Sequence, residues 1–140
     1  MANNLPTKEL IIAIVEKEGS ILMRKKPEGS LPYKETWYLF GCERLSTQED
    51  SVTIQNYLKI ELDINVEVNN RIIPSGFEIK KDHDGVEKNF IYSNLLCKYL
   101  NGTPQTPSGI ERVEWLPKNK LSEYDLVPPS VKLLKSLGYL

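Results

Sequence analysis

The chain lacks the residues and segments that mark several classes of protein. Its 140 residues include one histidine and two cysteines, and no apolar run approaches the roughly 20 residues of a membrane-spanning helix. Cys42 and Cys97 cannot form a disulfide framework, so we expect a reducing, cytoplasmic setting. Residues 1–8 lack the apolar core of a signal peptide. These absences favour a protein that does not enter a membrane.

An excess of either charge is also missing. Lys and Arg number 18 against 19 Asp and Glu, which gives a formal net charge of -1. No overall field then recruits nucleic acid or an anionic membrane, and we expect neither as a specific partner. The lone histidine, His83, precedes the turn signal Asp84-Gly85, so a Ser-His-Asp or Cys-His catalytic arrangement is not expected. Lysines flank the trio at 82–84, which predicts a solvated turn and not a metal site.

What is present is typical of one globular domain covering residues 1–140. The apolar run at 10–15 predicts a strand covered on both faces. Ser46 and Glu49 have the spacing of a capping box and predict the start of a helix that runs to about Leu62, where Asp63 tolerates a left-handed end. Further strands are predicted at 21–24, 37–40, 66–68, 72–79, 89–100 and 113–116, and a last helix at 130–137.

The stretch at 37–42, followed by the helix, resembles the Nudix box of the MutT-like pyrophosphohydrolases. That box is a glycine, a glutamate six residues later and, after eight more, the run Arg-Glu-apolar-x-Glu-Glu-x-Gly-apolar. A box that starts at Cys42 needs no insertion: Leu58 and Ile64 take the apolar positions and Glu61 the last glutamate. The other box positions carry different residues, namely Gln48, Asn56, Tyr57, Ile60 and Asp63. The segment 111–117 resembles the family's late strand, so the resemblance implies an α+β fold, a Nudix-like α/β/α sandwich with a mixed sheet.

The resemblance also implies where catalytic carboxylates and metal ligands lie. Glu61 is the candidate catalytic residue and metal ligand that the box retains. Glu43 directly follows the start of the box and is a second metal candidate, and Glu111 lies in a loop where relatives often carry a catalytic or metal-binding glutamate. Each of the three has an alternative as an ordinary surface acid. Magnesium is expected as a cofactor only if the protein is active, because one carboxylate holds it when substrate phosphates supply further oxygens.

Three residues are candidates for ligand binding. Arg24 and Lys25 leave the second strand beside the presumed cleft, where the resemblance implies contact with phosphate or nucleoside. Trp37 has a ring that stacks on a base or ribose, with a core position as its alternative. Cys42 is interpreted as a small residue where the backbone packs closely.

The altered box leaves three hypotheses for function. The first is a Nudix-fold protein with a degenerate box, weakly active or inactive, that binds a nucleoside-diphosphate-type ligand or a protein partner. The second is an active, metal-dependent pyrophosphohydrolase of a nucleoside diphosphate-linked substrate that uses Glu61 with carboxylates outside the box. The third is a structural homodimer domain without a ligand. Fold alone does not decide among them, so whether the chain is an enzyme stays open here.

Overall fold

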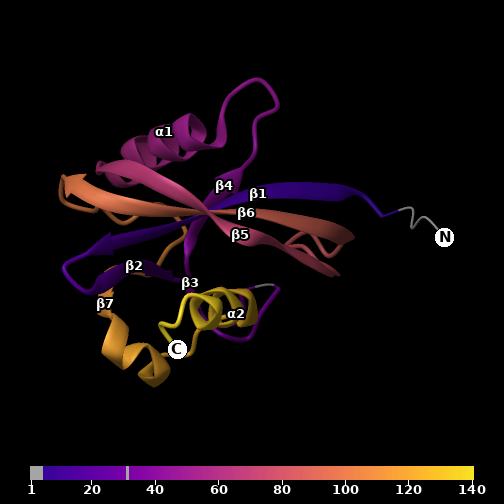
Figure 1. Cartoon of the computed structure of the whole chain (residues 1–140). Coiled ribbons are helices and arrows are strands. Elements are labelled where there is room, and N and C mark those ends of the chain that lie inside the picture. The colour runs from indigo at the N-terminus through magenta and orange to yellow at the C-terminus, as the bar shows by residue number, and fades with distance from the viewer. Residues whose placement is uncertain (1–4, 31) are drawn as a thin grey trace.

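A computed structural model of the chain describes residues 5–30 and 32–140, and for residues 71–76 it describes the backbone alone. Within these residues one mixed sheet lies between two helices, with α1 on one side and α2 on the other (Figure 1). The elements are β1 (Thr7–Lys17), β2 (Ser20–Lys25), β3 (Trp37–Tyr38), β4 (Phe40–Glu43), α1 (Asp50–Leu62), β5 (Asn65–Lys81), β6 (Glu87–Asn101), β7 (Arg112–Pro117), the 3-10 helix η1 (Lys118–Glu123) and α2 (Pro128–Ser136). No helix in the described part of the chain is long and apolar enough to cross a membrane.

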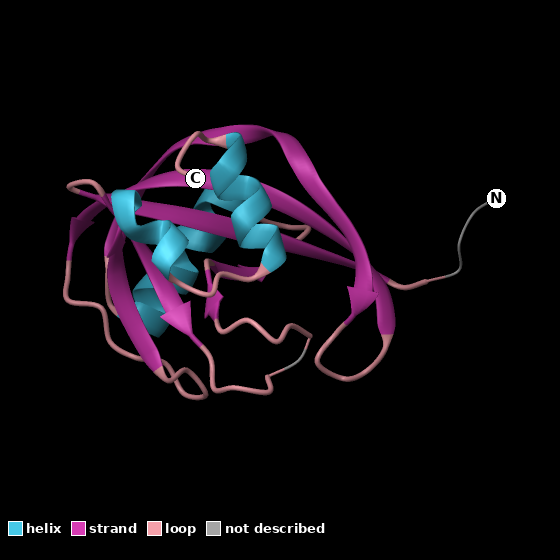
Figure 2. Cartoon of the chain, turned by 90° about the horizontal axis from the view of Figure 1, so that it is seen from below, coloured by secondary structure: helices cyan, strands magenta, loops and turns pink. Residues whose placement is uncertain are grey.

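The sheet has a branched topology. Its main path runs β3-β2-β1-β6-β5, while β4 pairs with β1 and β7 pairs with β2. The long β1–β6 pair is parallel and the other pairs are antiparallel. Seen from below, α2 lies across the strands (Figure 2). The expectation of an α+β fold with a mixed sheet between helices is confirmed.

Alternate residues of β1 supply two separate cores. Ile11, Ala13 and Val15 face α1, whereas Ile14 lies in the core under α2. This follows from the strand period, in which successive side chains point to opposite faces of the sheet. The α1 core also contains Phe40, Ile54, Leu58, Leu62, Ile64 and Leu95. Because both faces of β1 are covered, its sequence is a continuous apolar run, as predicted.

The two ends of α1 were predicted with different success. Asp63 ends the helix in the left-handed conformation (φ 59°, ψ 40°), as expected for the position that the Nudix box fills with glycine. The predicted capping box is wrong, because the helix begins at Asp50 with Glu49 as N-cap and no side-chain cap bond. Arg44 and Ser93 anchor the Asp50 carboxylate instead (Nε–Oδ1 3.0 Å, Oγ–Oδ2 2.9 Å). These longer-range contacts fix the start of the helix four residues after Ser46.

The segments predicted as two strands at 66–68 and 72–79 form one long strand, β5, with irregular register against β6. The hairpin turn predicted at Asp84-Gly85 is confirmed: Asp82 N–H donates to the carbonyl of Val86 (2.9 Å), and Gly85 has φ +79°. The register pairs Glu78 with Phe90 and Lys80 with Lys88. Polar residues at alternate positions of this hairpin therefore share one face.

Candidate functional site

The face of α1 that corresponds to the box charges is mostly solvent-exposed. Asn56 and Glu61 are exposed, and Ile60 is 74% exposed. Tyr57 is half-buried and packs against the α1 core. Burial raises the pKa of the Tyr57 phenol and the positive charge of Arg24 opposes that shift, so the phenol stays protonated near neutral pH.

Arg24 lies beside this face and is held by aromatic side chains. Its Nε donates to the carbonyl of Leu39 (3.2 Å), and its guanidinium carbon lies 5.8 and 5.5 Å from the ring centres of Tyr38 and Phe40. Burial lowers the pKa of Arg24, while the nearby phenols of Tyr57 and Tyr38 raise it. Arginine stays charged in proteins, so a half-buried positive charge adjoins Tyr57, a position that the resembling family fills with glutamate.

The three candidate carboxylates do not converge. Glu43 is exposed and lies 3.6 Å from Lys8, and Glu111 lies 3.6 Å from Lys25. Glu61 is an exposed residue of α1, and its backbone carbonyl accepts from the Gln105 side chain (3.4 Å). Among residues 5–30 and 32–140, no group of three or more His, Cys, Asp or Glu side chains could hold a metal ion.

The donors on α1 do not fit the magnesium site that the resemblance implies. Magnesium needs oxygen ligands in near-ideal octahedral geometry. Ile60 offers no ligand, the protonated phenol of Tyr57 is a poor one, and Glu61 is left as the single carboxylate among the four box-face residues. No catalytic step through a box-bound metal follows from this arrangement.

Trp37 and Lys25 lie on the opposite face of their strands from Arg24. The register pairs Arg24 with Tyr38 and Lys25 with Trp37. Trp37 is 4% exposed and packs edge-on against Tyr124 (centroids 5.5 Å apart) in the α2 core. The structure therefore places Trp37 in the core and not where its ring meets a ligand, because the indole is buried among the residues of the α2 core and Tyr124. Lys25 likewise does not converge with Arg24.

Lys26, the next residue, returns to the side of Arg24. Its Nζ lies 4.2 Å from the centre of the Tyr38 ring, and it forms no ion pair within the described residues. The pKa of Lys26 is lowered to about 8, first by burial and then by the positive charges of Arg24 and Lys80, with the negative charge of Asp82 opposing the shift. The Tyr38 hydroxyl is buried and has no hydrogen bond of normal geometry among the described residues, although the Tyr33 backbone amide lowers its pKa. Two positive charges, of Arg24 and Lys26, thus lie around the Tyr38 ring, and neither has an ion-pair partner within 4 Å among the described residues.

A network of hydroxyl and ammonium groups adjoins Lys26. The Lys80 ammonium donates to the hydroxyl oxygens of Tyr33 (2.5 Å) and Tyr92 (2.8 Å) and lies 3.2 Å from Oε2 of Glu78. Both tyrosine hydroxyls donate to that same Oε2, at 2.7 and 2.9 Å. Sequence analysis missed this network, because Tyr33 comes from the β2–β3 loop and the others from β5 and β6. The alternation of Glu78, Lys80 and Asp82 before the turn at Asp84-Gly85 was the sequence signal that could have indicated a polar face here.

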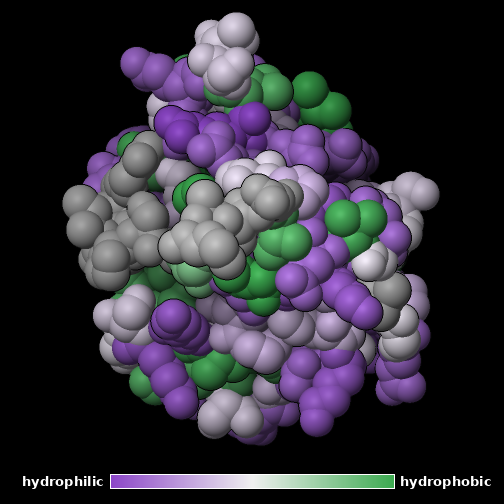
Figure 3. Space-filling model, turned by 90° about the vertical axis from the view of Figure 1, so that its right-hand side faces the viewer, coloured by the Kyte–Doolittle hydropathy of each residue, from purple (hydrophilic) through white to green (hydrophobic). Residues whose placement is uncertain are grey.

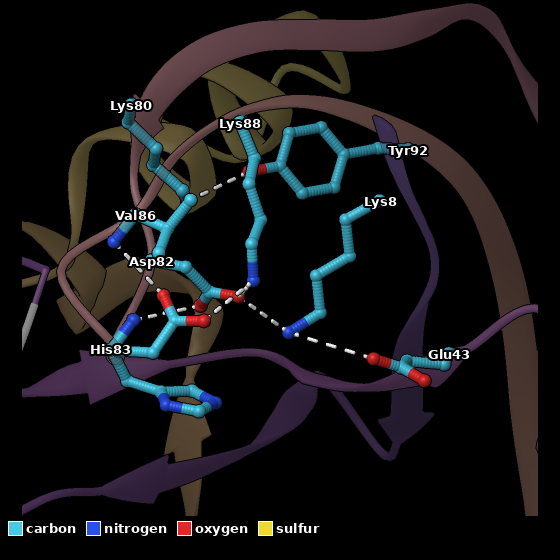
Figure 4. Close-up of polar contacts among 9 residues, drawn as sticks. Lys8, Glu43, Lys80, Asp82, His83, Val86, Lys88 and Tyr92 are labelled. Carbon is cyan, nitrogen blue, oxygen red and sulfur yellow. Dashed lines mark hydrogen bonds and ion pairs between the residues drawn. The ribbon is translucent and has the colours of Figure 1, made fainter. Parts of the chain in front are cut away.

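Asp82 closes the same hairpin and is not the solvated residue that the sequence predicted. It is 5% exposed and accepts from Lys8 Nζ (2.8 Å), Lys88 Nζ (2.9 Å) and the His83 backbone amide (2.8 Å), as Figure 4 shows. Burial would raise the pKa of Asp82, but these hydrogen bonds outweigh it and hold the pKa well below its usual range. His83 and Asp84 are exposed, as expected. No local pattern in the sequence predicts that Lys8 reaches this turn, because the two residues lie 74 positions apart.

The end of the molecule at this hairpin also exposes apolar side chains. Phe77, Ile79 and Ile91 are 61%, 48% and 39% exposed, and Phe77 pairs with Ile91 across β5 and β6. Figure 3 shows hydrophobic areas on this face of the molecule, interrupted by hydrophilic ones. The homodimer suggested by the sequence stays a prediction.

Known proteins resemble this chain in structure and not in sequence. The sequence matches no protein-family model and has no significant match among curated proteins. The solution structure of the E. coli ORF135 protein superposes with a TM-score of 0.74 at 20% identity, over 95% of this chain and 89% of that one. A MutT NUDIX hydrolase from Burkholderia pseudomallei gives 0.71 at 18% identity, over 92% and 96%. A NUDIX hydrolase from Nitrosomonas europaea gives 0.70 at 9% identity, over 95% and 88%. The chain therefore has the Nudix fold, as the resemblance to the box implied.

Proposed function

We propose that this Nudix-fold protein binds a nucleoside-diphosphate-type ligand through positively charged side chains, and hydrolyses it weakly or not at all. The observation that carries the proposal is the half-buried guanidinium of Arg24, which lies within 6 Å of the Tyr38 and Phe40 ring centres and next to Tyr57. In the box register this position belongs to a metal-binding glutamate. A half-buried positive charge beside a neutral phenol favours an anion directly, without a bridging metal ion.

The same substitution disfavours catalysis. Losing one group that stabilises transition-state charge typically costs about 2.7–4 kcal/mol, or ~100- to 1000-fold in rate. Gln48, Tyr57 and Ile60 replace three carboxylates of the box at once. In the resembling family, metal ions offset the repulsion between the box glutamates and the phosphates of the ligand. Without three of those negative charges this repulsion is reduced, so the ligand no longer needs the ions to bind.

Calorimetry with ADP, ADP-ribose and UDP-glucose in EDTA tests the proposal, and chromatography of the same samples with magnesium detects products. We expect binding that survives EDTA and weakens with salt, because screening shortens to ~8 Å at physiological ionic strength. Lys26→Gln should weaken binding about tenfold, which corresponds to about 1.4 kcal/mol. Lys25→Gln is the matched control, because it removes the same charge one residue away on the opposite face.

Three results would contradict the proposal, and the first is that none of the three nucleotides binds in EDTA. Equal weakening by Lys26→Gln and Lys25→Gln would show that only overall charge matters. Magnesium-dependent turnover at about 1 per second, abolished by Glu61→Gln, would favour the hydrolase hypothesis. Glu61 is exposed, so this variant changes the box without disturbing the core.

Restoring the box tests the register. Gln48, Asn56 and Ile60 are exposed, so Gln48→Glu, Asn56→Arg and Ile60→Glu should be tolerated. Tyr57→Glu places a carboxylate beside Arg24 and forms an ion pair there. The combined variant should fold and bind manganese, detected by electron paramagnetic resonance, more tightly than the parent chain. A folded variant with no gain in manganese affinity would contradict the register.

A further inference from the structure

The network around Glu78 has the geometry of an occupied oxyanion site. One carboxylate oxygen, Oε2, accepts from the hydroxyls of Tyr33 (2.7 Å) and Tyr92 (2.9 Å) and lies 3.2 Å from the Lys80 ammonium. Three donors from separate segments of the chain thus converge on one negatively charged oxygen. Hydrogen bonds of this charge-assisted kind are about twice as strong as neutral ones.

The donors are oriented by one another and not only by Glu78. A lysine ammonium has three protons to donate, and Lys80 directs two of them at the hydroxyl oxygens of Tyr33 and Tyr92. With those oxygens accepting from Lys80, each hydroxyl proton is free to point toward Glu78. The Lys80 ammonium also lies 4.4 Å from the ring centres of both Tyr33 and Phe90, which holds it in place. The three donors would therefore remain in position if the carboxylate left.

Glu78 is the more exposed member of its ion pair with Lys80. Its side chain is 28% exposed, against 16% for Lys80. It lies at the edge of the sheet on β5, so its side chain can turn toward solvent without moving the core. Such a carboxylate can be exchanged for another oxyanion, whereas a buried carboxylate such as that of Asp82 cannot.

We propose that Glu78 occupies a phosphate subsite formed by Tyr33, Lys80 and Tyr92, and that a phosphate group of the ligand binds there by displacing the Glu78 carboxylate. This inference rests on the proposed function and names one of its contact points. Glu78 then acts as an internal competitor that weakens ligand binding, and also satisfies the donors when the ligand is absent.

The neighbouring charges favour phosphate over another carboxylate. Lys26 lies close enough for the charges of Lys80 and, with opposite sign, Asp82 to shift its pKa, and it has no ion-pair partner within 4 Å among the described residues. The Glu78 carboxylate carries one negative charge and pairs with Lys80. A phosphate dianion carries a second negative charge that Lys26 can neutralise, so the exchange gains an interaction that Glu78 does not supply.

Isothermal calorimetry with inorganic phosphate and pyrophosphate in EDTA tests the subsite. Glu78→Gln and Glu78→Ala should each raise the affinity about tenfold or more, because the competing charge is gone. The matched control is Glu87→Gln, which removes the same charge from an exposed site on the same hairpin and should change the affinity less than twofold. Adding Tyr33→Phe and Tyr92→Phe to Glu78→Gln should abolish the gain. Thermal melting confirms that each variant is folded.

Several outcomes would overturn the subsite. They are an unchanged or weaker affinity in both Glu78 variants, an equal gain in Glu87→Gln, or a gain that survives the two tyrosine changes. Acetate binding as tightly as phosphate in Glu78→Ala would overturn the choice of phosphate. The two proposals fail separately: if Glu78→Ala gains phosphate affinity but no nucleotide binds in EDTA, the subsite stands and the nucleoside-diphosphate proposal fails.

Discussion

Replacing Asp82 by Asn should destabilise the protein, because this carboxylate fixes the β5–β6 turn to β1. Its oxygens accept from Lys8, Lys88 and the His83 amide at 2.8, 2.9 and 2.8 Å. Both ammoniums bond Oδ2 and the amide bonds Oδ1. An asparagine whose oxygen keeps the backbone amide therefore turns its N–H groups toward both lysines, and the opposite rotamer turns them toward the amide. A hydrogen bond to a charged group contributes about 1.5–3 kcal/mol.

Partial exposure to solvent and neighbouring carboxylates reduce the loss of stability expected from breaking a hydrogen bond to Asp82. The Lys8 and Lys88 side chains are 19% and 18% exposed and lie 3.6 Å from Glu43 and 3.0 Å from Asp84, respectively. We therefore expect a loss of about 2 kcal/mol, which is a large part of the 5–15 kcal/mol typical of a domain. Urea unfolding at pH 7, followed by circular dichroism, measures this free energy. The midpoint should fall with little change in the slope.

The pH dependence gives a second, independent measurement. The pKa of Asp82 is depressed in the folded state, so its contribution is fully present above the unfolded pKa of about 3.9 and is lost as pH falls through the lower folded value. The difference between the parent chain and Asp82→Asn should therefore be equal at pH 7 and pH 5 and smaller at pH 3. Asp84→Asn is the control, because Asp84 also pairs with Lys88 but is exposed. A loss as large in Asp84→Asn, or none in Asp82→Asn, would refute the reasoning.

Three further predictions concern the ligand site and the box helix. Affinity for pyrophosphate should fall as pH rises from 7 to 9 in calorimetry, because the Lys26 ammonium has a pKa lowered to about 8 and loses its proton in this range; Lys26→Gln should show a flatter profile. Asp63→Gly should keep or slightly increase stability in urea, whereas Asp63→Val should cost about 1–2 kcal/mol, because residue 63 has φ 59°. Gly102→Ala should cost about 1–3 kcal/mol in the same assay, because Gly102 has φ +103° and a Cβ there would collide with the Asp63 carbonyl oxygen; an Ala variant as stable as the parent would contradict this close approach.

The sequence was enough to predict the order of elements and the end of the box helix. The apolar run of β1, the turn at Asp84-Gly85 and the left-handed position at Asp63 each depend on neighbouring residues, so their signals are local. The match of residues 42–64 to the Nudix box then implied the fold that contains these elements. The predicted start of α1 was wrong because the observed start depends on Ser93, which lies 43 residues from Asp50.

The grouping of side chains into a site was decided by the tertiary structure. Strand alternation separates Arg24 from Lys25, but only the packing of α2 and η1 shows that Trp37 and Lys25 face away from the box helix. Tyr33 reaches Glu78 across 45 residues, and Lys8 reaches Asp82 across 74. Such contacts depend on how the sheet branches at β1 and on the register of the hairpin. Hydrogen bonds and charge pairs act only over a few ångströms in space, so distance along the chain does not reveal which residues they join.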